Sequence, residues 1–273
     1  MDQRQGSALT IPGAIIIAAA IIAVALIYVF KPAQAPALTT QNVQQPQRIE
    51  ITLTPITASD HILGNPNAAV RIVEFSDPSC PFCKTFHPTM KKLIEEYGPT
   101  GNVAWVYRAF PLDKPDAQGR ILHPNAGRES QAFECAAALG GNGAFWKYVH
   151  RLYEITPSDQ GKSLDQKLLP DIAQFAGLDA VSFNECLTSG RFKEKIEKQY
   201  LDGINAGVSG TPTSIFVLSK PAPKSLDVII ADLQVQMGVP VIMSTDRLRI
   251  VMSGAVPESA LKAILEPLLM EVK

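Results

Sequence analysis

The stretch from residue 68 to residue 99 sets the strongest limit on the fold of this 273-residue chain. Residues 68–75 (AAVRIVEF) have the β-branched and aromatic content of a buried strand, and the turn residues SDPS follow directly. Apolar side chains then recur at three- and four-residue steps up to Gly98-Pro99, which predicts a helix with one apolar face. Pro88 lies inside this helix and should kink it. A strand, a tight turn and a helix in this order predict one unit of an α/β fold.

The predicted helix begins at a CPFC motif, residues 80–83. Pro81 suits the first helical position, which makes Cys80 the N-cap. The first N–H groups of a helix lack intrahelical partners, so a thiolate on Cys80 would accept hydrogen bonds from the N–H groups near Phe82 and Cys83. Such contacts lower a cysteine pKa from about 8.5 into a range of about 3.5–7.5. The motif therefore predicts a redox pair, with Cys80 as the nucleophile and Cys83 as the resolving thiol.

Two other interpretations of the CPFC motif are a zinc site and a plain structural disulfide. A structural zinc site requires four ligands, commonly as two close pairs. The remaining cysteines, Cys135 and Cys186, are isolated, and the four histidines form no paired spacing: His61, His87, His123 and His150. His87 is expected at a surface position of the helix, and no metal site is expected. The formal net charge of −1 gives no broad basic field, so no nucleic-acid partner is expected either.

The N-terminal fifty residues differ in composition from the rest of the chain. Residues 1–10 form a short tail, and residues 11–30 (IPGAIIIAAAIIAVALIYVF) carry no charge. About 20 apolar residues in a helix cross a bilayer core, so this run predicts a transmembrane anchor. AQA at residues 33–35 resembles a cleavage site, but the run exceeds the usual ~7–15 apolar residues of a signal peptide. Residues 31–50, rich in Pro, Gln, Ala and Thr, predict a flexible linker before a folded domain at 51–273.

Two segments together resemble the DsbA/BdbD-like thiol-disulfide oxidoreductases of the thioredoxin superfamily. They are DHILGNPNAAVRIVEFSDPSCPFCKTFH at residues 60–87 and GVSGTPTSIFV at residues 207–217. The resemblance covers roughly residues 60–218 and then residues 248–273. Two motifs in the right order, separated by a helical stretch, are more specific than a lone CxxC motif. The resemblance implies a thioredoxin fold with a helical insertion.

The resemblance also implies roles for individual residues. Thr211-Pro212 should form a cis-proline loop beside the cysteine pair, where its backbone would bind an extended substrate peptide. Pro81 and Phe82, between the two cysteines, are expected to contact the same substrate. Glu74, on the strand before the pair, matches a buried acidic residue that is thought to help move the proton of the second cysteine. A solvated carboxylate at the edge of a strand is the alternative interpretation of Glu74.

The remaining pattern fits this fold. Residues 103–112 (VAWVYRAFPL) predict the second strand of a βαβ unit. Residues 113–206 are helical in pattern and predict the insertion, and its first helix should run from Pro124 to Gly140-Gly141.

Cys135 and Cys186 both lie in the predicted insertion. An even remaining pair in a protein outside the cytoplasm suggests a disulfide bond. Two buried free thiols are the alternative.

One stretch departs from the family. After residues 214–218 (SIFVL) a tight turn should lead to the last strand at residues 248–254, yet residues 219–247 intervene. Within them, residues 226–237 are spaced for a helix, and VPVIM at residues 239–243 predicts an extra strand. Because the strand after the cis-proline starts near the cysteines, this segment should leave the sheet at the opposite end.

These patterns predict a thiol-disulfide oxidoreductase that spans a cell membrane once and holds its domain outside the cytoplasm. The predicted reaction oxidises cysteine pairs of reduced exported proteins, and a membrane-bound partner reoxidises the Cys80–Cys83 pair. No cofactor beyond these two cysteines is expected. Two alternatives stay open: a disulfide reductase or isomerase of the same fold, and a redox-inert module for metal binding or delivery.

Overall fold

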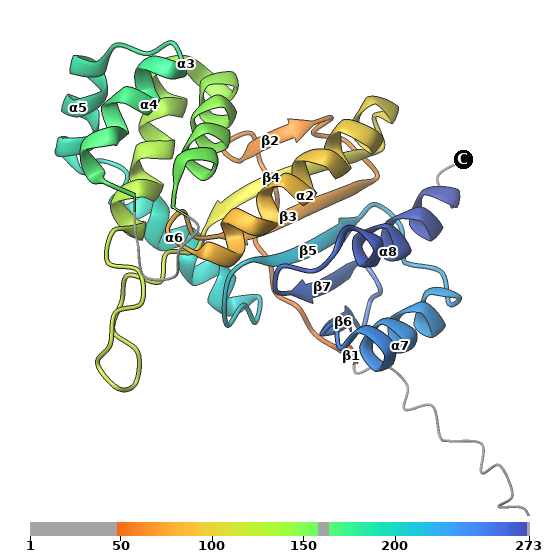
Figure 1. The fold of residues 1–273 in the computed structure, drawn as a ribbon. Helices are drawn as coiled ribbons and strands as arrows, with labels where there is room; N and C mark the ends of the chain where they lie inside the picture. The colour runs from red at the N-terminus through yellow and green to blue at the C-terminus, as the bar shows by residue number, and fades with distance from the viewer. Residues whose placement is uncertain (1–47, 158–163, 272–273) are drawn as a thin grey trace, which may run out of the picture. The chain divides into compact units, whose positions relative to one another are not determined.

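The centre of the structure, a computed structural model that describes residues 48–157 and 164–271, is a seven-stranded sheet (Figure 1). The strand order is β1-β6-β7-β5-β3-β4-β2. The strands are β1 (Arg48–Ile49), β2 (His61–Gly64), β3 (Val70–Ser76), β4 (Val103–Ala109), β5 (Thr213–Leu218), β6 (Val241–Ser244) and β7 (Arg249–Ser253).

The predicted βαβ unit forms the middle of this sheet. Strand β3 pairs in parallel with β4 and antiparallel with β5, and helix α2 (Pro81–Tyr97) connects β3 to β4. Both strands are buried along nearly their whole length, as their apolar sequences predict. Pro88 lies within α2, and the helix continues past it to Tyr97. A short 3₁₀ helix, η1 (Gly98–Thr100), follows at the predicted end.

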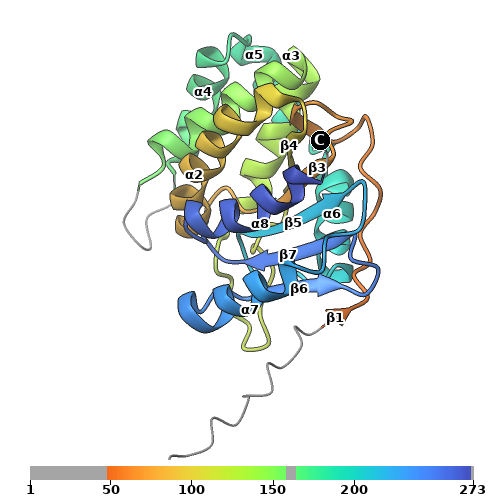
Figure 2. The same ribbon diagram turned by 90° about the vertical axis from the view of Figure 1, so that its right-hand side faces the viewer.

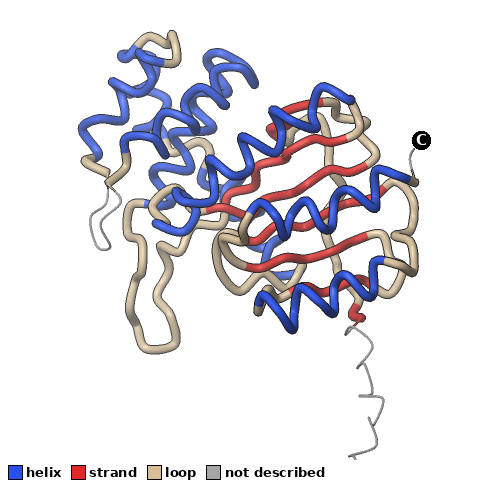
Figure 3. Tube along the Cα trace, turned by 45° about the vertical axis from the view of Figure 1, so that its right-hand side comes forward, coloured by secondary structure: helices blue, strands red, loops and turns tan. Residues whose placement is uncertain are grey.

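Helices cover both faces of the sheet. On one face lie α2, α7 (Leu226–Met237) and α8 (Glu258–Met270), which Figure 3 shows in front of the strands. Helix α6 (Lys193–Asn205) lies on the other face, as the side view in Figure 2 shows. Each face therefore has its own apolar core, and β3 contributes side chains to both.

The predicted helical insertion lies between β4 and β5 (green in Figure 1). It consists of α3 (Ala126–Ile155), the 3₁₀ helix η2 (Gln166–Leu168), α4 (Leu169–Phe175), α5 (Ala180–Ser189) and α6. Gly141 interrupts α3 with φ 71° and ψ −170°, a backbone conformation that glycine adopts readily. The break predicted at Gly140-Gly141 is therefore present, and two helical stretches meet there. The first stretch begins at Ala126 instead of Pro124.

A disulfide bond joins Cys135 on α3 to Cys186 on α5. The two residues are 51 positions apart in sequence, and both are buried. The bond holds α5 against the long helix of the insertion. The structure therefore confirms the predicted disulfide bond between Cys135 and Cys186, and the alternative of two buried free thiols is wrong.

A strap of residues 50–60 crosses the α6 face of the sheet from β1 to β2. Ile51 and Leu53 in this strap pack into the core of that face. Arg108 on β4, only 3% exposed, donates hydrogen bonds to Asp60 at 2.8 Å and to Asp202 of α6 at 2.6 Å. Because a buried charge is costly unless it is paired, this arginine fastens both the strap and α6 to the sheet.

The segment at residues 219–247 leaves and re-enters the sheet at the predicted end. Leu218 pairs with Val70 at the start of β3, the end of the sheet away from the cysteines. Helix α7 then runs back along the sheet, burying Leu226, Ile230 and Leu233, and β6 starts at the opposite end. There the N–H of Ser253 donates to the carbonyl of Pro240 at 3.3 Å. The middle of the segment thus returns to the end of the sheet that holds the cysteines, which the sequence did not predict.

Residues 31–47 of the predicted linker lie outside the described residues, and the structure describes only the end of this linker, next to the predicted domain start at residue 51. Arg48 and Ile49 form β1, which pairs in parallel with β6. The Arg48 side chain also forms an ion pair with Asp227 at 2.7 Å. Strand β6 supplies an open sheet edge that recruits these two residues, and their own sequence carries no signal of that partner.

The predicted tail at residues 1–10 and the predicted anchor at residues 11–30 lie outside the described residues. Within residues 48–157 and 164–271, no helix combines the length and the apolar character needed to cross a membrane.

Replacing residues 219–247 with a two-residue turn tests how far the site depends on this segment. The N–H of Leu218 donates to the carbonyl of Leu248 at 2.9 Å, so β5 and β7 already meet at hairpin distance. We expect the shortened protein to unfold at a lower urea concentration, because α8 and β7 lose their apolar cover. The alkylation rate of Cys80 should stay within about twofold, since no side chain of the segment bonds to the site. A folded variant that loses most of this reactivity would contradict the expectation.

Candidate active site

The CPFC motif lies at the point where β3 gives way to α2. Cys80 is the N-cap of α2, with φ −76° and ψ 123°, and Pro81 occupies the first helical turn, as predicted. The N–H of Cys80 donates to the carbonyl of Asp77, and the N–H of Lys84 donates to the carbonyl of Cys80. Both thiols are free, with Cys80 4% exposed and Cys83 fully buried. Only Cys80 is therefore open to a second molecule.

The surroundings shift the pKa values of the two thiols in opposite directions. A hydrogen bond from the Cys83 thiol is the largest cause that lowers the pKa of Cys80 to about 6, against the effect of burial. The N–H of Cys83 makes a smaller contribution, so the predicted role of the helix N–H groups is present but secondary. Burial raises the pKa of Cys83 well above its ordinary value, and the hydrogen bond to Cys80 adds to the rise. At neutral pH the pair therefore holds its negative charge on Cys80.

The loop before β5 lies beside Cys80. The Thr211–Pro212 peptide bond is cis, as the resemblance implies. The Cys80 Sγ lies 3.5 Å from the carbonyl oxygen of Thr211, and the carbonyl of Pro212 accepts the N–H of Gly254. The Thr211 hydroxyl is buried without a hydrogen-bond partner among the described residues, and Thr211 also lowers the pKa of Cys80. A free hydroxyl at this position can donate to the thiolate when it forms.

Glu74 lies in the interior of the central strand β3 and is fully buried, so it is not a solvated carboxylate at a strand edge. Burial raises its pKa to about 7, against weaker effects of Ser76 and Trp105. Its charge in turn raises the pKa of Cys83. Glu74 therefore has a pKa near neutral pH and interacts electrostatically with the buried Cys83 thiol. Both properties are expected of a group that accepts the proton of that thiol.

Phe82 and Pro81 lie at the surface over the site. Phe82 is 58% exposed and Pro81 is partly exposed. An exposed phenylalanine directly beside an accessible thiol offers an apolar contact to another chain. Pro81, Phe82 and the partly exposed Thr211 thus border the slightly exposed Cys80, whereas Pro212, Glu74 and Cys83 are buried.

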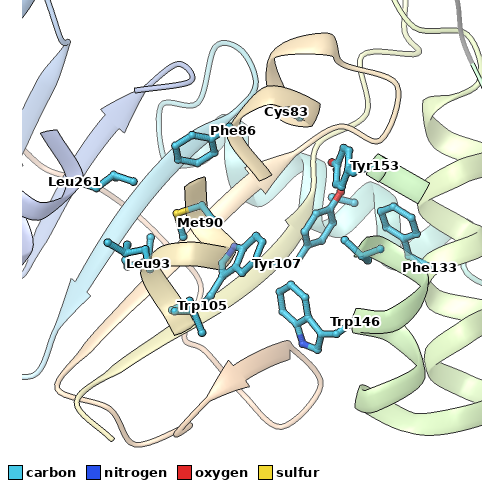
Figure 4. Packing of buried hydrophobic residues seen from close by; sticks show 14 of the residues in the cluster. Cys83, Phe86, Met90, Leu93, Trp105, Tyr107, Phe133, Trp146, Tyr153 and Leu261 are labelled. Atoms are coloured by element: carbon cyan, nitrogen blue, oxygen red, sulfur yellow. The ribbon is translucent and has the colours of Figure 1, made fainter. Parts of the chain in front are cut away.

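The surface position predicted for His87 is wrong. His87 is 4% exposed, and its Nε2 lies 2.7 Å from Nδ1 of His150 on α3. Burial lowers the pKa of His87 to about 3. The helical insertion packs α3 onto this side of α2, a tertiary contact that helical spacing within α2 does not reveal. Figure 4 shows the same interface, where Tyr153 and Trp146 of α3 face side chains of α2 and β4.

Sequence reasoning missed Asp77, in the turn before Cys80. Its fully buried carboxylate accepts hydrogen bonds from the N–H of Ser79 at 2.7 Å, the N–H of Leu112 at 2.8 Å and Nδ1 of His123 at 2.8 Å. Its own N–H points to the Cys83 sulfur at 3.4 Å. An aspartate in a turn before a helix is ordinary, so only the folded structure distinguishes it.

No group of three or more histidine, cysteine, aspartate or glutamate side chains in the described part of the chain is placed to hold a metal ion. The geometry at Cys80 and Cys83 is instead that of a thiol pair that can form, accept and release disulfides without another group.

Solved structures similar in fold include bacterial DsbA proteins. DsbA2 of Pseudomonas aeruginosa matches with a TM-score of 0.53 and 19% identity, over 78% of this chain and 96% of that one. Alpha-DsbA1 of Wolbachia pipientis matches with a TM-score of 0.57 and 18% identity, over 81% of this chain and 98% of that one. These likenesses establish the fold, including the helical insertion.

Curated relatives match shorter stretches of their own length. A putative protein-disulfide oxidoreductase of Rickettsia typhi is 26% identical over 167 residues, which is 60% of this chain and 57% of that protein. A Na⁺/H⁺ antiporter, NhaA 1, of Salinispora arenicola is 32% identical over 155 residues, which is 56% of this chain and 21% of the antiporter. The chain therefore spans less than two thirds of these relatives.

The thioredoxin family matches residues 57–218, from the strap through β5. This range includes the CPFC motif, Glu74 and the Thr211-Pro212 loop, and it covers more than half of the chain. The chain belongs to the thioredoxin family.

Proposed function

We propose that this chain is a protein thiol-disulfide oxidoreductase that oxidises cysteine pairs of other proteins. The observation that carries the proposal is the asymmetry of the two thiols, because the pKa of Cys80 is lowered to about 6 and that of Cys83 is raised. The cis Thr211–Pro212 loop beside Cys80 and the similarity to a putative protein-disulfide oxidoreductase of Rickettsia typhi support it.

The reaction starts from the Cys80–Cys83 disulfide. A substrate thiolate attacks Cys80 Sγ, a mixed disulfide forms there, and Cys83 leaves as a thiolate that takes up a proton. Glu74, buried beneath the pair, exchanges that proton. The second substrate thiolate then attacks its own partner sulfur in the mixed disulfide, and Cys80 leaves as a thiolate. Two electrons have moved from the substrate dithiol to the cysteine pair.

The direction of the reaction follows from the second step. A thiolate of low pKa is the better leaving group, so a Cys80 pKa of about 6 favours transfer of the disulfide to the substrate. We place the substrate chain over Phe82, Pro81 and the backbone of the Thr211-Pro212 loop, of which Phe82 is the most exposed. Reoxidation of Cys80 and Cys83 then requires an acceptor of two electrons, which we assign to a membrane-bound partner.

The first prediction concerns the two cysteines. The purified full chain should oxidise a reduced test protein, and Cys80→Ser should bring the rate down to the uncatalysed level, because it removes the accessible nucleophile. When Cys83→Ser is mixed with the disulfide form of the test protein, its Cys80 should attack that disulfide and accumulate mixed disulfides, visible on non-reducing gels, because no second thiol resolves them. A Cys135→Ala/Cys186→Ala double variant is the control and should retain the rate. Full activity of Cys80→Ser would disprove the mechanism.

Measurement of the reduction potential separates an oxidant from a reductase or isomerase. Equilibration with glutathione should give a potential nearer to about −120 mV, typical of a strong oxidant, than to about −270 mV, typical of a reductant. A value at the reducing end would reassign the direction of the reaction while leaving the thiol chemistry intact.

We further propose that residues 11–30 anchor the protein in a cell membrane and that the domain faces away from the cytoplasm, where its substrates are reduced exported proteins. The uncharged apolar run and the Cys135–Cys186 disulfide support this placement, because such bonds persist in oxidising compartments. We expect a membrane-impermeant maleimide to label Cys80 in intact, mildly reduced cells. Peptide mapping of the same sample should find Cys135 linked to Cys186. Labelling that occurs only after lysis would contradict the placement.

The next prediction concerns Glu74. Its folded pKa of about 7 lies above the ordinary value of 4.5, so the folded protein binds a proton that the unfolded chain releases as the pH rises. Glu74 therefore destabilises the fold progressively from about pH 4.5 and fully above about pH 7. Glu74→Gln should raise the free energy of unfolding by up to about 3 kcal/mol at pH 8, and by much less at pH 5.

Urea denaturation of the reduced proteins at both pH values measures this difference. The same variant should slow formation of the mixed disulfide from the oxidised Cys80–Cys83 pair near neutral pH, because glutamine cannot supply the proton that the departing Cys83 thiolate takes up. An equal effect of Glu74→Gln at pH 5 and pH 8 would contradict a raised pKa.

A further inference from the structure

The turn before Cys80 and the loop before α3 meet at one buried carboxylate. Asp77 contacts both cysteines through its backbone, since its carbonyl accepts the N–H of Cys80 and its N–H points to Cys83 Sγ. Its side chain holds Nδ1 of His123 at 2.8 Å. His123 in turn closes the base of the 113–122 loop, because its N–H donates to the carbonyl of Leu112. Asp77 therefore links the His123 imidazole to the turn that carries the thiol pair.

Three buried carboxyl groups, Asp77, Glu129 and Glu74, interact with the residues around the thiol pair, and burial raises the pKa of Glu129 and Glu74. Glu129 on α3 is fully buried and accepts hydrogen bonds from Ser79 Oγ and Gln166 Nε2, both at 2.6 Å. The charge of Asp77 opposes ionisation of Cys80, and the charge of Glu74 does the same for Cys83. A thiolate in this cluster needs a compensating cation.

The CPFC motif itself supplies no cation, because its two central residues are Pro81 and Phe82. Lys84, the next residue after the motif, directs its amino group to the carbonyls of Glu154 and Thr156. Within the described residues, His123 is the ionisable cation bonded to this carboxylate cluster. Its side chain is 19% exposed, so it can exchange protons with solvent.

We propose that His123, held by Asp77, is a positioning residue that supplies the positive charge facing the Cys80 thiolate. The inference rests on the thiol exchange proposed above and adds to it the residue that stabilises the reactive anion. The Asp77–His123 pair is neutral when both partners are charged, so the imidazolium cancels the repulsion that Asp77 exerts on the thiolate. The same cation stabilises Cys80 each time it departs from a mixed disulfide.

The groups around His123 favour its charged form. Burial lowers the pKa of His123, but the hydrogen bond and charge of Asp77, with the charges of Cys80 and Glu129, raise it above its ordinary value overall. Asp113, at the start of the same loop, is a further carboxylate near Asp77. The imidazolium and the Cys80 thiolate therefore coexist over a range of pH above the pKa of Cys80.

Two substitutions of His123 distinguish the effect of its positive charge from the effect of its hydrogen bond to Asp77. In His123→Asn the side-chain amide keeps a donor close to the position of Nδ1, so the contact with Asp77 is retained while the charge is lost. In His123→Ala both are lost. His150→Asn is the matched control, because it makes the same change in a histidine of α3 whose ring contacts His87. All three are made in the full chain, and the thiolate absorbance of Cys80 is followed against pH.

We expect His123→Asn to raise the pKa of Cys80 by roughly one unit, the usual effect of removing a nearby opposite charge. The equilibrium with glutathione should shift by up to about tenfold toward the oxidised form of the protein. His150→Asn should leave both quantities unchanged. An unchanged or lower Cys80 pKa in His123→Asn would overturn the inference, whereas a wild-type Cys80 without a lowered pKa would instead overturn the proposed function.

A measurement on the unaltered protein covers the case in which the variants do not fold. Electrostatic coupling is reciprocal, so forming the Cys80–Cys83 disulfide should lower the pKa of His123 by roughly the same one unit. Titration of the His123 ring proton by NMR in the reduced and oxidised states measures this change. Identical His123 pKa values in the two states would overturn the inference.

Discussion

The burial of one face of α2 fixes the position of both thiols. Phe86, Met90 and Leu93 on this face are at most 1% exposed. Figure 4 shows them between the sheet, where Trp105 lies, and Leu261 of α8. Truncating a buried side chain of this size costs about 2–5 kcal/mol, so the face holds the helix firmly against the sheet. The first turn of α2 is thereby held in register with the end of β3, and Cys80 has to meet the Thr211-Pro212 loop.

Two buried carboxyl groups near the thiols, Asp77 and Glu74, have different roles because their hydrogen-bonding surroundings differ. Asp77 accepts three hydrogen bonds and acts as a fixed acceptor that organises the turn. Glu74 lacks a hydrogen-bond partner among the described residues, and burial raises its pKa to about 7. A carboxyl group whose interactions with Ser76 and Trp105 are weak and whose pKa lies near neutrality can exchange a proton at little cost. The first residue therefore positions the site, and the second is suited to proton transfer beneath it.

Local sequence predicted those features that depend on a few neighbouring residues. The N-cap position of Cys80 follows from Pro81 at the first helical position, and the break at Gly141 follows from a glycine pair. The cis bond before Pro212 came from the resemblance, because a proline alone does not determine the isomer.

Features that depend on distant partners were not predictable in this way. The burial of His87 requires α3 to pack on α2, and the contact between Asp77 and His123 joins residues 46 positions apart. Neither contact leaves a periodic pattern in the sequence.

Strand β1 has a mechanical consequence for the way the domain is held. The chain enters the fold at an edge strand of two residues, which the Arg48–Asp227 ion pair reinforces. Tension applied to the chain ahead of Arg48 would act first on this short pairing with β6, at the far side of the sheet from β4. Three strands of the sheet, β6, β7 and β5, lie between β1 and β3, the strand that leads to Cys80. The β1–β6 pairing can therefore separate under tension before the strands that hold Cys80 and Cys83 are disturbed.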